Sequence, residues 1–315
     1  MSKRNLLLCF DAFGTLFTPS TPIPTAYVQA AARHGINCGN AEHPKALAAQ
    51  FKLAFKDESK QNPNYGRATG LGAEKWWGNV IQKSFKEFVK PDQEVPQALI
   101  TDLLRRYSTK EGYRLYPDVL PFFQTLRDKI SRGADASSWP WDKTVVGIIT
   151  NSDDRVPGIL NSFGLRIGPR RVGKSDQRSQ KATLGDDISF VVLSYDVGFE
   201  KPDRRMFDAA SEMLQETLAG NDEELKADDF EKLYVGDELE KDYLGAEAAG
   251  WNSIYLDRGS STGGSGGDGE LELVRKNVTD KEGKTTCVTA AKDLRALGSW
   301  CSSRKIGGSK DESTD

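Results

Sequence analysis

Residues 6–17, LLLCFDAFGTLF, carry the pattern that decides the fold. The five residues before Asp11 form an apolar run without the alternation of a half-exposed strand, which is typical of a strand buried on both faces. Gly14, three residues after the acid, supplies backbone freedom for a turn. The stretch therefore predicts a central strand over Asn5–Phe10 that ends in a carboxylate.

Four later apolar runs are interpreted as strands in the same way: Thr144–Ile149, Phe190–Leu193, Lys232–Val235 and Ser253–Leu256. Helical patterns alternate with them, among them Val119–Lys129, whose apolar positions repeat with helical spacing. Strands that alternate with helices favour a parallel arrangement. The predicted fold class is therefore α/β, with a Rossmann-like, doubly wound parallel sheet.

More than a hundred residues separate the first of these strands from the second, and most of them are compatible with helices. We predict an inserted α-helical domain over 18–114, which divides the sheet-containing core into 1–17 and 115–301. Aromatic residues at helical spacing are interpreted as the core of the inserted domain: Trp76, Trp77, Phe85 and Phe88.

Two segments have the composition of flexible chain. Residues 258–270, RGSSTGGSGGDGE, read as a linker, so we expect a flexible insertion in the core at about 258–286. The polar segment 302–315 is predicted to be a disordered tail.

The charge balance gives no indication of a polyanionic partner. The chain has 43 basic and 46 acidic residues, a formal net charge of −3, and no apolar run near the ~20 residues that span a bilayer. Asp11 interrupts the N-terminal apolar run too early for a secretory leader. We therefore expect neither nucleic acid nor membrane as a partner, and the sequence leaves the oligomeric state open.

The cysteine and histidine counts limit the expected cellular compartment and the kinds of catalytic site that the chain can form. The four cysteines show no CxxC pair and no regular spacing, which favours a reducing compartment, so we expect a cytoplasmic protein without excluding the nucleus. Only two histidines, His34 and His43, are present. A Ser-His-Asp triad or a histidine-built zinc site is therefore nearly excluded.

Chemically useful residues follow four of the five predicted strands. Asp11 follows the first strand, Thr150 and Asn151 follow the second, Lys201 the third and Asp237 the fourth. In an open parallel sheet, ligands bind at the carboxyl ends of the strands. We therefore expect these side chains to converge on one crevice.

These residue types suit phosphoryl transfer. An aspartate such as Asp11 can act as a covalent nucleophile. The carboxylates of Asp11 and Asp237 would repel each other unless a cation lay between them, and oxygen ligands of this kind suit Mg²⁺. Thr150 and the backbone at Asn151 are candidates to bind a phosphoryl oxygen, and Lys201 would neutralise the transferring group.

Four ordered segments resemble the motifs of the haloacid dehalogenase (HAD) superfamily: DAFGTLF at 11–17, IITNSD at 148–153, GFEKPDRRMF at 198–207 and VGDELEKDYLGAEAAGW at 235–251. The helical insertion after the first motif resembles the C1-type cap of a subgroup whose first motif reads DxxGTL. The resemblance implies a hydrolase of a small-molecule substrate with Asp11 as its nucleophile, Thr150 binding the phosphoryl group and Lys201 stabilising it. It also implies a set of Mg²⁺ ligands: Asp11, the backbone carbonyl of Phe13, Asp237 and, through water, Asp242.

Phe13 departs from the pattern of the family's phosphatases, which usually carry a second aspartate there as general acid and base. A phenyl ring can do neither, and general acid–base catalysis contributes typically ~10²–10⁴-fold. The rate loss should be smaller for acyl phosphates, aryl phosphates and halides, because their leaving groups need no proton. Glu238, Asp153 or a residue of the helical domain could supply the missing acid, and the sequence does not select among them.

Three functions remain open. The leading prediction is a Mg²⁺-dependent phosphohydrolase that forms a phosphoaspartate on Asp11. The alternative is a 2-haloacid dehalogenase, which also carries an aromatic residue at the position of Phe13 and would need an arginine such as Arg33 for the substrate carboxylate. The retained Asp237 weighs against it. The third is a binding or regulatory protein that has kept the fold and the metal site and has lost turnover with the missing acid.

Overall fold

The computed structural model describes residues 4–41, 43–132, 139–173, 186–219, 225–260 and 272–300. The strands of its main sheet are β1 (Asn5–Phe10), β4 (Lys143–Thr150), β5 (Ile167–Arg171), β6 (Ile188–Leu193), β7 (Phe230–Gly236), β8 (Asn252–Leu256), β9 (Val274–Thr279) and β10 (Thr285–Ala291). They lie in the order β5-β6-β4-β1-β7-β8-β10-β9.

β1 lies inside the sheet and pairs in parallel with β4 on one side and β7 on the other along its whole length. All six of its residues are buried. Parallel pairing continues through β6, β5 and β8 and on to β10, and among the described strands of this sheet only β9 and β10 pair antiparallel. The predicted α/β fold class with a parallel, Rossmann-like sheet is confirmed.

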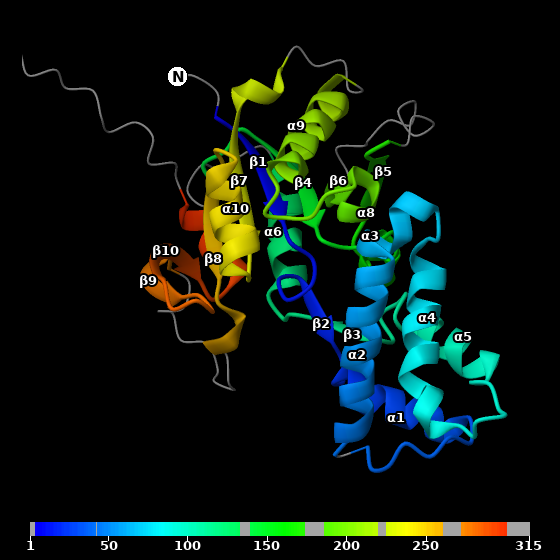
Figure 1. Cartoon of the computed structure of the whole chain (residues 1–315). Helices are drawn as coiled ribbons and strands as arrows, with labels where there is room; N and C mark the ends of the chain where they lie inside the picture. Colours follow the sequence, from blue (N-terminus) through cyan, green and yellow to red (C-terminus); the bar gives the residue numbers. More distant parts are fainter. Residues whose placement is uncertain are drawn as a thin grey trace, which may run out of the picture.

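Helices cover both faces of the sheet (Figure 1). They are α6 (Val119–Arg132), α7 (Arg155–Ser162), α8 (Ser194–Val197), α9 (Arg204–Ala219) and α10 (Gly245–Ala248), with short turns η4 (Ala227–Asp229), η6 (Arg258–Ser260) and η8 (Leu294–Ser299). Because successive side chains of a strand point to opposite faces, Leu6, Leu8 and Phe10 pack with α6 and α7. Leu7 and Cys9 pack with α9 and α10 on the other face. This two-sided burial explains the continuous apolar run of β1.

A helical region lies beside the sheet, between β2 (Phe17–Pro19) and β3 (Tyr113–Leu115), which pair antiparallel with each other (Figure 1). Its elements are α1 (Ile23–Arg33), α2 (Lys45–Gln61), α3 (Pro63–Gly66), α4 (Ala73–Phe85) and α5 (Gln97–Arg106), with turns η1 (Arg67–Thr69) and η2 (Lys86–Phe88). Trp76 and Phe85 are buried, whereas Trp77 and Phe88 are half-buried. None of the described helices combines the length and the apolarity needed to cross a bilayer.

Residues 274–291 correct the expectation of one flexible insertion over 258–286, because β9 and β10 extend the sheet beyond β8. Their turn is closed by Asp280, whose Oδ1 accepts the N–H groups of Glu282 (3.0 Å) and Lys284 (2.8 Å). The β-branched residues of these strands favour sheet, a signal hidden by the glycine-rich stretch before them. Residues 261–271 and the predicted tail 302–315 lie outside the described residues.

Candidate active site

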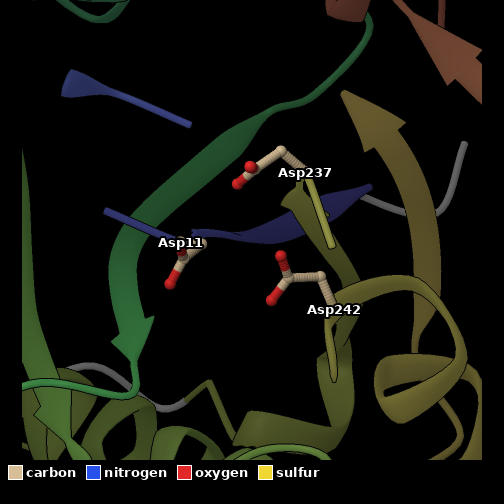
Figure 2. A group of neighbouring side chains, drawn as sticks. All are labelled: Asp11, Asp237 and Asp242. Carbon is tan, nitrogen blue, oxygen red and sulfur yellow. The ribbon is translucent and has the colours of Figure 1, made fainter. Parts of the chain in front are cut away.

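Three carboxylates meet at the carboxyl edge of the sheet. Asp11 follows β1, Asp237 follows β7, and Asp242 lies in the π-helical segment η5 (Leu239–Leu244). Figure 2 shows the three side chains grouped at the ends of these strands, and one carboxylate oxygen from each lies within 4.8 Å of the others. We call Asp11, Asp237, Asp242 and the lysine among them, Lys201, the carboxylate cluster.

The loop after β1 is shaped around the cluster. The N–H of Asp11 donates to the carbonyl of Val235 at 3.0 Å, which continues the pairing of β1 with β7 by one residue. Gly14 has a φ of +79°, and a Cβ there would lie 2.6 Å from Oδ1 of Asp237, so the position requires glycine. Thr15 donates from Oγ1 to the same oxygen at 3.0 Å. The two strand ends are thus held together.

Lys201 lies at the centre of a buried hydrogen-bond network. Its Nζ donates to Oδ1 of Asp11 and to Oδ1 of Asp242, both at 2.7 Å, and to the hydroxyl of Tyr234 at 2.6 Å. Asn151 holds the lysine through its main chain, donating from Nδ2 to the carbonyl (3.0 Å) and accepting the N–H at Oδ1 (2.6 Å). The amide of Asn151 therefore positions Lys201, whereas a phosphoryl contact of this residue stays a prediction.

Tyr234 is a site residue that the sequence reasoning missed. It is fully buried in β7, and its hydroxyl donates to the carbonyl of Ile149 at 2.7 Å while it accepts from Lys201. The available signal was a phenol within a strand otherwise rich in apolar residues, three positions before Asp237. A buried tyrosine usually needs a hydrogen-bond partner, and the partner here lies far away in the sequence.

The cluster carries excess negative charge, because one ammonium faces three carboxylates. Burial raises the pKa of Asp11 to about 7, with Lys201 opposing the rise and Asp242 adding to it. Burial and Asp242 raise the pKa of Asp237 to about 6, against the hydrogen bond from Thr15. Burial alone would lower the pKa of Lys201, but Asp11 and Asp242 hold it above its ordinary value. A cation bound here would relieve this repulsion.

The ligand atoms that the three carboxylates offer are all oxygen, which suits a hard divalent cation. Asp242 already accepts from Lys201 at Oδ1 and from the N–H of Glu238 at Oδ2 (2.9 Å). This engagement is compatible with the predicted contact through water. Asp11, Asp237 and the carbonyl of Phe13 stay the predicted direct ligands.

Thr150 and Phe13 lie beside the cluster in different surroundings. Thr150 ends β4, is buried, and belongs to the strand that neighbours β1. The ring of Phe13 packs edge-on against Phe17 and Tyr113, with centroid separations of 4.6 and 5.6 Å. Position 13 is therefore part of an aromatic surface.

Asp153 and Glu238, two candidates for the missing acid, are both engaged elsewhere. Asp153 is buried and accepts from Nε and Nη2 of Arg155, each at 2.8 Å, and from Nε1 of Trp77 at 3.0 Å. Burial pushes the pKa of Asp153 upward, but Arg155 and these hydrogen bonds hold it below its ordinary value. Glu238 pairs with Lys241 at 2.9 Å, largely in solvent. Asp153 is thus ionised at neutral pH and unsuited to donate a proton.

A pocket of about 260 Å³ adjoins the loops that carry the cluster. We call it the aromatic pocket, since half of its lining residues carry rings: Phe13, Tyr27, Phe51, Phe55, Tyr65, Trp77, Tyr107 and Tyr113. Asn151, Ser152 and Arg155 line it from the core. Trp77, interpreted from the sequence as core of the helical domain, is a pocket residue. Arg33 instead pairs with Asp102 of α5 at 2.8 Å.

Known proteins resemble this chain in sequence and in fold. An uncharacterised hydrolase of Schizosaccharomyces pombe is 31% identical over 251 residues, covering 80% of this chain and 90% of its own. The human haloacid dehalogenase-like hydrolase domain-containing protein 3 is 27% identical over 252 residues, covering 79% and 81%. The crystal structure of a defluorinating L-2-haloacid dehalogenase matches with a TM-score of 0.54 at 14% identity over 93% of each chain, a likeness of fold alone.

A family model extends this likeness to most of the chain. The model of the haloacid dehalogenase-like hydrolases matches residues 6–250, which include three of the four segments that resemble the superfamily motifs and all but the last residue of the fourth. Asp11, Lys201 and Asp237 all lie within this span. On these grounds the chain belongs to the haloacid dehalogenase-like hydrolase family.

Proposed function

We propose that the protein is a Mg²⁺-dependent phosphohydrolase that forms a phosphoaspartate on Asp11. The observation that carries this proposal is the bridge of Lys201 between Asp11 and Asp242, at 2.7 Å on each side. It holds one oxygen of the nucleophile and leaves the other to attack. The unbalanced negative charge of the cluster supports a divalent cation as the missing component.

Mg²⁺ would be held by Asp11, Asp237 and the carbonyl of Phe13, with Asp242 acting through water. When bound, it would offset the carboxylate charge and polarise a phosphoryl oxygen. The oxygen-only donors and the raised pKa values of Asp11 and Asp237 support this assignment.

The chain's own residues would orient the phosphoryl group and stabilise its charge. The free carboxylate oxygen of Asp11 attacks phosphorus, and the ammonium of Lys201 offsets charge on the transferring group. Thr150 and the backbone at Asn151 hold a phosphoryl oxygen. The side chain of Asn151 keeps Lys201 in register with Asp11.

Phe13 restricts the leaving group. With a ring at position 13, and with Asp153 bound to Arg155, neither side chain protonates the departing oxygen. The protein would therefore favour substrates whose leaving group departs as an anion. The same ring provides no general base for water, so the phosphoaspartate breaks down slowly and accumulates.

The helical region α1–α5 would act as a C1-type cap over the site. Trp77 of α4 donates to Asp153 at 3.0 Å, and Asn64 of α3 donates to the carbonyl of Ser194 at 2.7 Å. These bonds join the helical region to loops at the carboxyl edge of the sheet. The aromatic pocket lies between the two parts, which supports a role of the cap in substrate selection.

Two observations favour the dehalogenase alternative, namely the ring at Phe13 and the apolar character of the pocket. Two weigh against it. The family's 2-haloacid dehalogenases work without a metal, so their reaction would not need the carboxylate that Asp237 adds to the cluster. Arg155, the cation among the described lining residues, is already engaged by Asp153 and is poorly suited to bind a substrate carboxylate.

The test is hydrolysis of acetyl phosphate and p-nitrophenyl phosphate by the full chain. We expect turnover with Mg²⁺, loss of turnover in EDTA, and loss in Asp11→Asn. Intact-mass measurement after quenching should detect one phosphoryl group on the wild-type chain and none on Asp11→Asn. Chloride release from 2-chloropropionate in EDTA would favour the dehalogenase instead. Mg²⁺ binding without either turnover would favour the binding protein.

A further inference from the structure

The aromatic pocket has the size and lining of a binding site for an apolar, planar group. Its volume is about 260 Å³, whereas an apolar cavity of ~150 Å³ in another protein is enough to bind benzene. It therefore has room for a substituted ring or for two fused rings. Its position between the helical region and the core makes it accessible to a group attached to a phosphate at the cluster.

The rings contact one another around the pocket. Tyr27 stands edge-on to Phe51, with centroids 5.3 Å apart, and Phe55 lies 5.8 Å from Trp77. Tyr107 stands edge-on to Tyr113 at 5.7 Å on the side of β3. Aromatic pairs gain stabilisation beyond their burial when they meet edge-to-face or offset. A planar aromatic occupant therefore finds favourable partners here that a sugar or a short alkyl chain would not.

The charges in the lining are already paired. Asp153 engages Nε and Nη2 of Arg155 at 2.8 Å, and Nη1 donates to the carbonyl of Tyr107 at 3.3 Å. The guanidinium also lies 4.7 Å from the ring centre of Trp77. A carboxylate or a second phosphate would place a further negative charge beside Asp153, whose charge already balances that of Arg155, and an unbalanced buried charge is costly. The occupant is therefore uncharged.

Backbone strain occurs where one of these rings enters the pocket. Asn64 and Tyr65 have φ values of +48° and +58°, which non-glycine residues rarely adopt. The side chain of Asn64 is held by Ser194, which accepts at its carbonyl (2.7 Å) and donates from Oγ (3.1 Å). Tyr65 thereby reaches the ring of Trp76 at 5.2 Å and lines the pocket. Strain of this kind persists where a particular geometry is required.

The lining also includes the two loops that carry the reacting groups. Phe13 follows Asp11 by two residues, and Asn151 holds the main chain of Lys201. We infer, on the basis of the proposed function, that the substrate is an aromatic group joined through oxygen to phosphate, either an aryl or an aroyl phosphate. The aromatic group occupies the pocket and the phosphate lies at the cluster.

The chemistry of such a substrate matches the ring at position 13. The oxygen of Asp11 forms a bond to phosphorus, and the bond between phosphorus and the bridging oxygen breaks. Its electron pair leaves with that oxygen as an aryl oxide or an arenecarboxylate, which needs no proton to depart. Water then attacks the phosphoaspartate, restores the Asp11 carboxylate and releases inorganic phosphate, with its protons passing to phosphate and solvent.

The experiment compares benzoyl phosphate with acetyl phosphate, using the full chain and Mg²⁺. The leaving group of each substrate is a carboxylate, so a difference in kcat/KM between them measures the effect of the phenyl ring. Burying a phenyl group in place of a methyl should raise kcat/KM roughly 10–100-fold. p-Nitrophenyl phosphate measured beside benzoyl phosphate distinguishes an aryl from an aroyl source. Near-equal kcat/KM values for the benzoyl and acetyl compounds would overturn the inference and leave the phosphohydrolase intact.

A matched pair of variants locates the selectivity. Ile23→Trp fills the pocket from α1, and we expect it to abolish most of the benzoyl-to-acetyl ratio. Leu120→Trp makes the same kind of change at an exposed position of α6 outside the lining and should leave the ratio unchanged. Equal ratios in wild type and Ile23→Trp would contradict a role of the pocket.

Binding without turnover separates this inference from the proposed function. If acetyl phosphate is not hydrolysed at all, the phosphohydrolase proposal fails. Calorimetry with phenylphosphonate and methylphosphonate then tests the pocket by itself. Tighter binding of the phenyl compound in wild type, lost in Ile23→Trp, supports an aromatic ligand, and equal affinities refute it.

Discussion

The carboxylate cluster and the aromatic pocket are neighbours with opposite physical characters. In the cluster, Lys201 is held among carboxylates that it does not fully neutralise, and burial together with Asp242 raises the pKa values of Asp11 and Asp237. In the pocket, the charge of Arg155 is balanced by Asp153 and much of the remaining surface is aromatic. The two neighbouring regions thus differ in electrostatics: the cluster carries unbalanced charge, whereas the one charged residue of the described pocket lining is paired.

Removal of the lysine should have the largest effect on the cluster. In Lys201→Met the buried carboxylates lose their ammonium, so we expect unfolding free energy to fall by about 3–5 kcal/mol. Hydrolysis should fall at least about 10²-fold. Urea denaturation and steady-state assays with Mg²⁺ measure both.

Lys241 of η5, whose side chain is 43% exposed, provides the control for this change. Lys241 pairs with Glu238 largely in solvent, so Lys241→Met should alter stability by less than about 1 kcal/mol. Equal losses in the two variants would show that the cluster does not depend on its central charge.

The second prediction concerns Phe13, which lines the pocket and follows Asp11 of the cluster by two residues. Phe13→Asp supplies an acid and removes a ring, so turnover of alkyl phosphates should rise by roughly 10²–10⁴-fold. The benzoyl-to-acetyl ratio should fall, since a wall of the pocket is lost. Paired kcat/KM values for an alkyl phosphate and the two acyl phosphates check this. No gain on alkyl phosphates would contradict our explanation of the missing acid.

A smaller effect on stability is expected at Trp77, which lines the pocket and donates a hydrogen bond to Asp153 of the core. Trp77→Phe keeps a ring in the pocket but removes the Nε1 donor to the buried Asp153, and a hydrogen bond to a charged group contributes about 1.5–3 kcal/mol. Thermal and urea denaturation measure the loss. Trp76→Phe is the control, because its Nε1 donates to the carbonyl of Asn62 within the helical region. If the control loses as much stability, the bond to Asp153 is not special.

The last prediction concerns the pH dependence of the metal-free protein. The pKa values of Asp11 and Asp237, about 7 and 6, lie above those of unfolded aspartates, so the folded state binds more protons. The contribution of these two groups to stability is then fully present below about pH 4 and is lost as pH rises through 6 and 7. Tm measured from pH 5 to 8 should fall in EDTA and recover with Mg²⁺. Asp237→Asn should flatten the decline, and an unchanged slope would argue against this origin.

The cluster could be predicted from sequence because its geometry follows from topology. The limits of β1 match the prediction, and the other four predicted strands lie within two residues of theirs at every end. Once those strands are parallel, the residues after them must meet at one edge. Asp11, Lys201 and Asp237 follow from that rule without knowledge of a single rotamer.

The aromatic pocket could not be predicted in this way. Its rings come from positions between Phe13 and Tyr113, on loops, helices and a strand of three residues. Which ring faces inward depends on how each helix is rotated, as the half-buried Trp77 shows beside the buried Trp76. β2 and β3 are too short to give a periodic signal, and the polar composition of β5 conceals its strand.

β2 and β3, which pair with each other, form the double-stranded tether through which the chain enters and leaves the helical region. Pro19 and Tyr113 are register partners in that tether, and both line the aromatic pocket. Any twist of the tether therefore reshapes the walls around a ligand, and a ligand that fills the space resists the twist. The affinity for the ligand and the freedom of α1–α5 to rotate against the core are then thermodynamically linked. The best-bound molecule is also the one that most reduces the motion of the helical region, so a change in its dynamics is itself a measure of binding.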